Sequence, residues 1–181
     1  MISKHYAFLM FNILGLEVTW AACAYGATHE LVYLGFWVGI VYVTIHFLIS
    51  KQRLRDLFVV LFIGGAGVLL DISNSLVSII SFEDSHTSIF LLPYWLISLW
   101  AVFSLLLPYS LSWLTKNLPL AAVLGAIGGG FSYWLGERLG AIQLQDPILL
   151  STTIYTIQWG IFTVIAFLLL RRINAVLTNS I

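Results

Sequence analysis

The feature that most limits the fold of this chain is a series of long apolar runs separated by short polar segments. A helix needs about 20 apolar residues to cross the hydrocarbon core of a bilayer. The runs that meet this requirement are residues 6–26, 31–50, 57–81, 89–113, 118–136 and 148–170. Only 9% of the residues are charged, too few for the surface of a soluble globular domain. The sequence therefore predicts an all-α integral membrane protein with six transmembrane helices, in which residues 1–181 form a single domain.

The basic residues fall almost entirely on one side of this six-helix arrangement. That side carries Lys4, Lys51, Arg53, Arg55, Lys116, Arg171 and Arg172, while Arg138 stands alone on the other. The opposite loops hold the acidic residues Glu30, Glu83, Asp84, Glu137 and Asp146. Because cytoplasmic loops of membrane proteins carry the excess of lysine and arginine, both termini are predicted to be cytoplasmic.

Several classes of function find no support in the sequence. The net charge is zero and no large basic cluster is present, so a nucleic-acid-binding surface is not indicated. A single cysteine, Cys23, cannot form an intramolecular disulfide or a multi-cysteine metal site. His46 is expected near the cytoplasmic end of its helix, away from the acidic residues inside the apolar runs, so no metal site is predicted. No cofactor is predicted, and no nucleophile motif appears in the sequence.

One carboxylate, Asp71, stands inside the third apolar run. Successive residues of a helix are rotated by about 100° around its axis. This rotation places Asp71 on one helix face together with small and polar residues. The members of that face are Gly64, Gly67, Asp71, Asn74, Ser75 and Ser78. A charge at this depth costs at least a few kcal/mol, so it must meet a partner, reach water or be protonated. Two interpretations stay open: Asp71 is a functional carboxylate, or it is held by partners on adjacent helices.

The later helices carry local signals for their ends and packing. Asn117 followed by Pro119 is typical of a helix cap with a first-turn proline. Pro93 and Pro108 are expected to kink the helix over 89–113. The helix over 118–136 has a stripe of small residues that favours close packing, formed by Ala121, Gly125, Gly128, Gly129, Ser132 and Gly136.

The depths of the polar residues suggest a pocket. A rise of about 1.5 Å per residue places Glu17 and Gln158 near the midplane and Asp71 in the outer half of the membrane. The pocket would open to the outer half and close around Glu17, unless Glu17 only contacts Gln158 or a serine. Deep tryptophans such as Trp20, Trp100 and Trp159 either pack or form its apolar wall. The candidate ligand-binding or proton-exchanging residues are Asp71, Glu17, Asn74, Ser132, Tyr133, Gln158, Trp20 and Trp100.

Three functions are compatible with these features. The leading hypothesis is binding or transport of a lipidic or small amphipathic molecule in the predicted pocket. The second is a membrane-embedded enzyme that modifies lipids, with Asp71 and Glu17 as acid and base. It requires the two carboxyl groups to lie within reach of each other. The third is a non-catalytic partner in a membrane complex. Membrane lipids are the expected partners, with a homo-oligomer or a membrane partner protein as further candidates.

A spaced set of residues resembles a known family. The set comprises Asn12, Trp20, Cys23, His46, Asp71, Pro93-x-Trp95, Leu99-Trp100, Phe103, Ser110-Leu111-x-Trp113-Leu114 and the block GAIGGGFSYWLGERLGA from Gly125 to Ala141. It resembles domain-of-unknown-function family 2878, small multi-pass bacterial inner-membrane proteins. The resemblance implies a Gram-negative inner-membrane location and genes near those for fatty-acid-modifying enzymes, but no catalytic residue. Where the family usually has Gly-Pro, this chain has Gly129-Gly130, so a proline-fixed helix break is not carried over.

Overall fold

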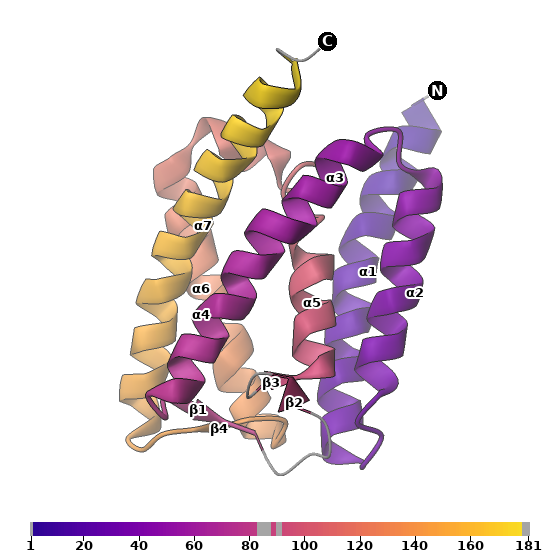
Figure 1. The fold of residues 1–181 in the computed structure, drawn as a ribbon. Coiled ribbons are helices and arrows are strands. Elements are labelled where there is room, and N and C mark those ends of the chain that lie inside the picture. The colour runs from indigo at the N-terminus through magenta and orange to yellow at the C-terminus, as the bar shows by residue number, and fades with distance from the viewer. Residues whose placement is uncertain (1, 83–87, 90–91, 179–181) are drawn as a thin grey trace.

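The computed structural model describes residues 2–82, 88–89 and 92–178, which are helical along most of their length (Figure 1). The helices are α1 (Ile2–Thr28), α2 (Leu34–Ile49), α3 (Arg53–Val59), α4 (Gly65–Leu76), α5 (Tyr94–Ser104), α6 (Leu118–Leu139) and α7 (Ile148–Thr178). Two antiparallel pairs of short strands join β1 (Ile80–Ser81) to β4 (Gln143–Leu144) and β2 (Ser88–Ile89) to β3 (Leu92–Pro93). The all-α prediction is confirmed, with these strands confined to the connections.

The helices form two groups joined by a diagonal rod. In one group α1, α2 and α5 pack together, and in the other α6 packs along α7. The rod is the continuous helix Arg53–Leu76, which comprises α3, a π-helical turn over Val60–Gly64, and α4. Figure 1 shows both termini at one end of the bundle and the short strands at the other.

Within the part of the chain that the structure describes, four helices are long and apolar enough to cross a membrane, which supports the prediction of a membrane protein. They are His5–Thr28, Arg53–Leu76, Leu118–Leu139 and Ile148–Thr178. Two shorter apolar helices, Leu34–Ile49 and Tyr94–Ser104, lie beside them. The shorter α2 buries Gly35, Gly39, Tyr42 and His46, whose spacing of three to four residues forms one inward face.

The helix predicted over 89–113 is much shorter than expected. Pro93 precedes its first residue, Tyr94, and the helix ends at Ser104. Pro108 does not kink the helix. Its ring would clash with the carbonyl of Ser104 four residues earlier in a continuing helix, so the chain turns instead. The Asn12 amide of α1 donates to the Leu105 carbonyl at 3.2 Å and thereby satisfies one group freed by the helix end.

The helix predicted over 57–81 also has different limits. It begins four residues earlier, at Arg53, and ends at Leu76. Ser78, which was expected on its polar face, lies beyond the end with a left-handed φ of 60°. Within the helix, Gly64, Gly67, Asp71 and Asn74 are buried, so this part of the predicted face is confirmed.

The helix cap predicted for α6 is confirmed, and the close packing predicted for its small residues is confirmed in part, because Gly128 and Ser132 line a cavity. The Asn117 side chain accepts a hydrogen bond of 3.1 Å from the Leu120 N–H and caps the helix. A Cβ at Gly125 would overlap Thr163 of α7, and one at Gly130 would overlap Thr156. These glycines therefore let the two backbones approach closely. Glu83 and Asp84, expected on the outer face, lie outside the described residues.

Candidate functional site

Asp71 is fully buried and is held by donors from three other helices. The Trp100 indole N–H of α5 donates to Oδ2 at 2.7 Å. The Tyr133 hydroxyl of α6 lies 2.7 Å from Oδ1 and 2.6 Å from Oδ2, and donates to the carboxyl group. The Tyr155 hydroxyl of α7 donates to Oδ1 at 3.3 Å. Asp71 is therefore the point at which α4, α5, α6 and α7 are joined.

Two glycines make room for the aromatic side chains around this carboxyl group. A Cβ at Gly67 would overlap the Trp100 indole, and one at Gly129 would overlap the Trp159 indole. Trp100 stacks on Trp159 with ring centroids 4.9 Å apart and an interplanar angle of 11°. Because Gly67 lies four residues before Asp71 on the same helix face, Trp100 can cross the glycine and reach the carboxylate.

Asn74 and Gln158 pair with each other. The Asn74 amide donates to Gln158 Oε1 at 2.8 Å, and the Gln158 amide donates back to Asn74 Oδ1 at 2.9 Å. This reciprocal pair joins α4 to α7 one turn away from Asp71. Each amide thus has a protein partner, so the pair ties two helices together.

A cavity of about 510 Å³ lies between α1 and α6, with α5 behind it. Its walls include Trp20, Trp100, Phe103 and Trp159, and most of the surface is apolar. Exposed residues such as Phe131 also line it, so it opens to the outside of the bundle. Its volume lies within the roughly 300–1,000 Å³ of small-molecule pockets.

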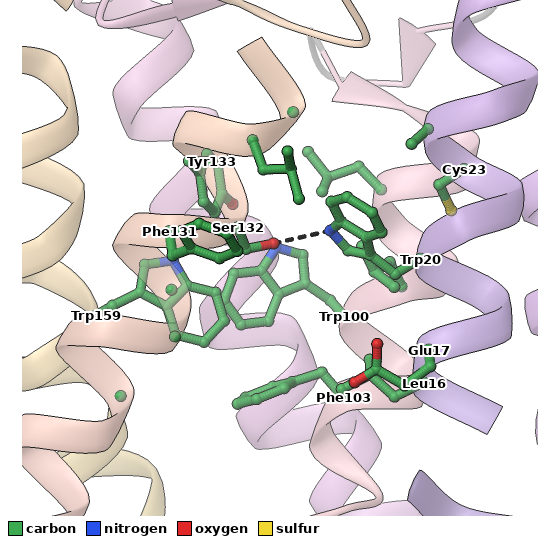
Figure 2. Close-up of a pocket in the computed structure, with 18 of the residues that line it drawn as sticks. Leu16, Glu17, Trp20, Cys23, Trp100, Phe103, Phe131, Ser132, Tyr133 and Trp159 are labelled. Carbon is green, nitrogen blue, oxygen red and sulfur yellow. Dashed lines mark hydrogen bonds between the residues drawn. The ribbon is translucent and has the colours of Figure 1, made fainter. Parts of the chain in front are cut away.

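Two polar contacts distinguish the α1 side of the cavity. The Trp20 indole N–H donates to the Ser132 hydroxyl of α6 at 2.8 Å, which bridges α1 and α6 across the cavity (Figure 2). Figure 2 also shows the Glu17 carboxyl group pointing into the cavity. Among the described residues, Glu17 has no hydrogen-bond or ion-pair partner, neither Gln158 nor a serine.

The structure divides the predicted site residues into two sets. Glu17, Trp20, Trp100, Ser132 and Tyr133 line the cavity. The remaining candidates, Asp71, Asn74 and Gln158, do not line it.

Trp100 and Tyr133 separate Asp71 from the cavity, because both line it and both donate to the carboxyl group. The carboxyl groups of Asp71 and Glu17 therefore do not share one chamber. The geometry that the acid and base hypothesis requires is not formed.

A second buried carboxylate, Asp56, lies where α2 turns into α3. Its Oδ2 accepts from the Ser50 hydroxyl at 2.5 Å and the Tyr109 hydroxyl at 2.6 Å, and lies 3.1 Å from His46 Nε2. Arg55 donates to Oδ1 through Nε at 3.1 Å and through its terminal nitrogen at 2.9 Å. Its guanidinium also lies 4.6 Å from the centre of the Tyr109 ring.

The sequence analysis missed this cluster, and His46 was the signal that could have found it. His46 and Asp56 are ten residues apart, on either side of a short turn. The ends of two antiparallel helices are close in space, so the pair could be expected to meet. Asp56 was not predicted as a buried residue, because the charged residues around it are typical of a solvated loop.

The described residues contain no group of three or more His, Cys, Asp or Glu side chains that could hold a metal ion. Comparisons with curated proteins and with solved structures find no match for the chain. A family profile with the description "Protein of unknown function (DUF2878)" matches residues 9–165, and this match covers most of the chain. The chain therefore belongs to this family, as its sequence resemblance indicated.

Proposed function

We propose that this protein binds, and moves or presents, an amphipathic molecule in the cavity between α1 and α6. The observation that carries the proposal is an aromatic cavity of about 510 Å³ that opens between two long apolar helices and contains a carboxyl group without a protein partner. An apolar pocket with a few polar groups is the usual form of a small-molecule site. An opening between membrane helices would admit a molecule directly from the lipid phase.

The residues of the site have different roles in this proposal. Glu17 contacts the polar group of the ligand, and Trp20 and Trp100 contact its apolar part. Ser132 holds Trp20 across the opening. Asp71 is a positioning residue, because it fixes Trp100 and Tyr133 in the cavity wall without reaching the ligand.

The proposal includes a six-pass single domain in a bacterial inner membrane, with cytoplasmic termini. Both termini lie at one end of the bundle, as six crossings require (Figure 1). Arg171 bonds to the Thr115 carbonyl at that end, next to Lys116. The 16 residues of α2 span roughly 24 Å, so its flanking residues would complete the crossing.

Reporter fusions test this topology. Alkaline phosphatase should be inactive when fused after Lys51 and active when fused after Asp146. An active fusion after Lys51 would show that the assigned orientation is wrong.

Two glycine substitutions test ligand binding with a matched control. A Cβ at Gly128 or at Gly65 would meet no heavy atom within 4 Å, so both positions accept a larger side chain. Gly128 lines the cavity and Gly65 does not. Gly128→Leu should therefore fill the cavity, while Gly65→Leu adds the same atoms elsewhere.

The measurement is mass spectrometry of lipophilic molecules that co-purify with each protein in mild detergent. Wild type and Gly65→Leu should retain the same molecule. Gly128→Leu should retain at most about a fifth of the amount that wild type retains. Identical profiles for all three proteins would overturn the binding proposal.

A further inference from the structure

The charge inside the cavity is of one sign. Of the described residues that line it, Glu17 alone has an ionisable carboxyl group, and none is lysine, arginine or histidine. A ligand with a phosphate, sulfate or carboxylate would meet no basic partner there. Charge complementarity therefore favours a ligand with a positive group and disfavours an anionic one.

Several other polar groups in the wall have partners within the protein. The Trp100 N–H and the Tyr133 hydroxyl donate to Asp71. The Trp20 N–H donates to Ser132, and the Thr163 hydroxyl donates to the Trp159 carbonyl at 2.7 Å. Among the described residues, Glu17 is the charged group of the wall, and it has no hydrogen-bond or ion-pair partner.

The aromatic surroundings of Glu17 suit a cation. Trp20 lies three residues further along α1 and lines the same cavity, so its indole and the Glu17 carboxyl group face a common space. Phe103 also lines this cavity. The faces of tryptophan and phenylalanine rings attract ammonium groups. A cation at this point would also offset the cost of a carboxylate at membrane depth.

We propose that the ligand is an amphipathic cation, in which a protonated amine or quaternary ammonium group pairs with Glu17 and an apolar chain or ring system contacts Trp20, Trp100 and Trp159. This inference rests on the proposed binding function and specifies its ligand class. The absence of basic groups from the cavity wall disfavours head groups that also carry a phosphate.

Three probes with the same twelve-carbon chain separate charge from apolar contact: dodecyltrimethylammonium, dodecanol and laurate. Each is titrated into the full-length protein in micelles of a neutral glycosidic detergent. Tryptophan fluorescence reports binding, because tryptophans line the cavity. The fluorescence change of Gly128→Leu gives the baseline, because in this variant the probe enters the micelle but not the filled cavity. Gly65→Leu should behave as wild type.

The ammonium probe should bind wild type at least about tenfold more tightly than dodecanol or laurate. Glu17→Gln should lower the affinity for the ammonium probe about tenfold and change that for dodecanol less than about twofold. Glu17→Asp keeps the charge and should retain the preference for the cation. Circular dichroism of each variant establishes that it is folded.

The outcomes separate this inference from the proposed function. Similar affinities for the three probes, all lost in Gly128→Leu, would overturn the cation assignment and leave binding in the cavity intact. Tighter binding of laurate would also overturn it. No binding of any probe above the Gly128→Leu baseline would count against both proposals.

Discussion

The two aspartates that are buried among the described residues are stabilised in different ways. Asp56 pairs with Arg55 and His46 and also accepts from two hydroxyl groups. Asp71 accepts from one indole N–H and two phenol hydroxyls, and no cation contacts it among the described residues. Asp56 lies in α3, at the end of the bundle near the termini, whereas Asp71 lies further along the same rod, in α4.

The two sites illustrate two ways of stabilising a buried acid on one helix. Near a helix end, long basic side chains can reach an acid and still keep contact with water. Deeper inside, tryptophan and tyrosine supply donors on largely apolar side chains, so the carboxyl group is bonded without burying a second charge. The Asp71 cluster can therefore support the wall of an uncharged aromatic surface.

The largest effect should follow from removing the acid that has charged partners. Asp56→Ala leaves Arg55 without its carboxylate and His46 without its hydrogen-bond partner. Loss of one member of a buried ion pair costs about 3–5 kcal/mol. The free energy of unfolding in detergent micelles, followed by circular dichroism, should fall by about this amount.

Arg53→Ala is the matched control on the same helix. Arg53 is exposed and donates to the Leu48 carbonyl at 3.0 Å. The control should change the unfolding free energy by less than about 0.5 kcal/mol. Equal effects of the two substitutions would show that the Asp56 cluster does not stabilise the α2–α3 junction.

Replacing Asp71 should lower the free energy of unfolding by a smaller amount, because no charged partner is left unpaired. Asp71→Ala removes the acceptor of Trp100, Tyr133 and Tyr155 and should cost about 2–3 kcal/mol. Asp71→Asn keeps one acceptor oxygen for Trp100, and its amide can donate to a tyrosine oxygen, so its cost should be about 1 kcal/mol.

The same unfolding measurement tests both Asp71 variants. If Asp71→Asn lowers the free energy of unfolding as much as Asp71→Ala, the ionised carboxylate itself is needed. Hydrogen bonds from neutral donors would then not explain the stability of this cluster.

The same comparison shows what sequence can predict. A lone acid in an apolar run stands out, so Asp71 and its helix face could be found. Its partners Tyr133 and Tyr155 could be placed at a similar depth, although their bonds to Asp71 could not be known. Asp56 could not be found in this way, because Lys51, Arg53 and Arg55 surround it and the local composition is that of a loop.

Other features depended on contacts between distant residues. The early end of α5 is accompanied by a bond from Asn12 on α1 to the Leu105 carbonyl, and apolar residues continue past the end of the helix at Leu105, Leu106 and Leu107. The separation of Asp71 from Glu17 depends on the rotamers of Trp100 and Tyr133, which a depth estimate along the helix axis does not contain. Sequence could therefore place residues by depth, but could not decide which of them face the cavity.

The smallest effect isolates a single neutral donor of the Asp71 cluster. Trp100→Phe removes the N–H that donates to Asp71, and Trp159→Phe removes an N–H that has no hydrogen-bond partner among the described residues. The two indoles stack on each other, so both substitutions lose similar ring contacts. Trp100→Phe should therefore cost about 1 kcal/mol more than Trp159→Phe, in the range of hydrogen bonds measured inside membrane proteins. The difference between their unfolding free energies measures that bond, and a difference near zero would mean that packing, without the hydrogen bond, holds Trp100 in place.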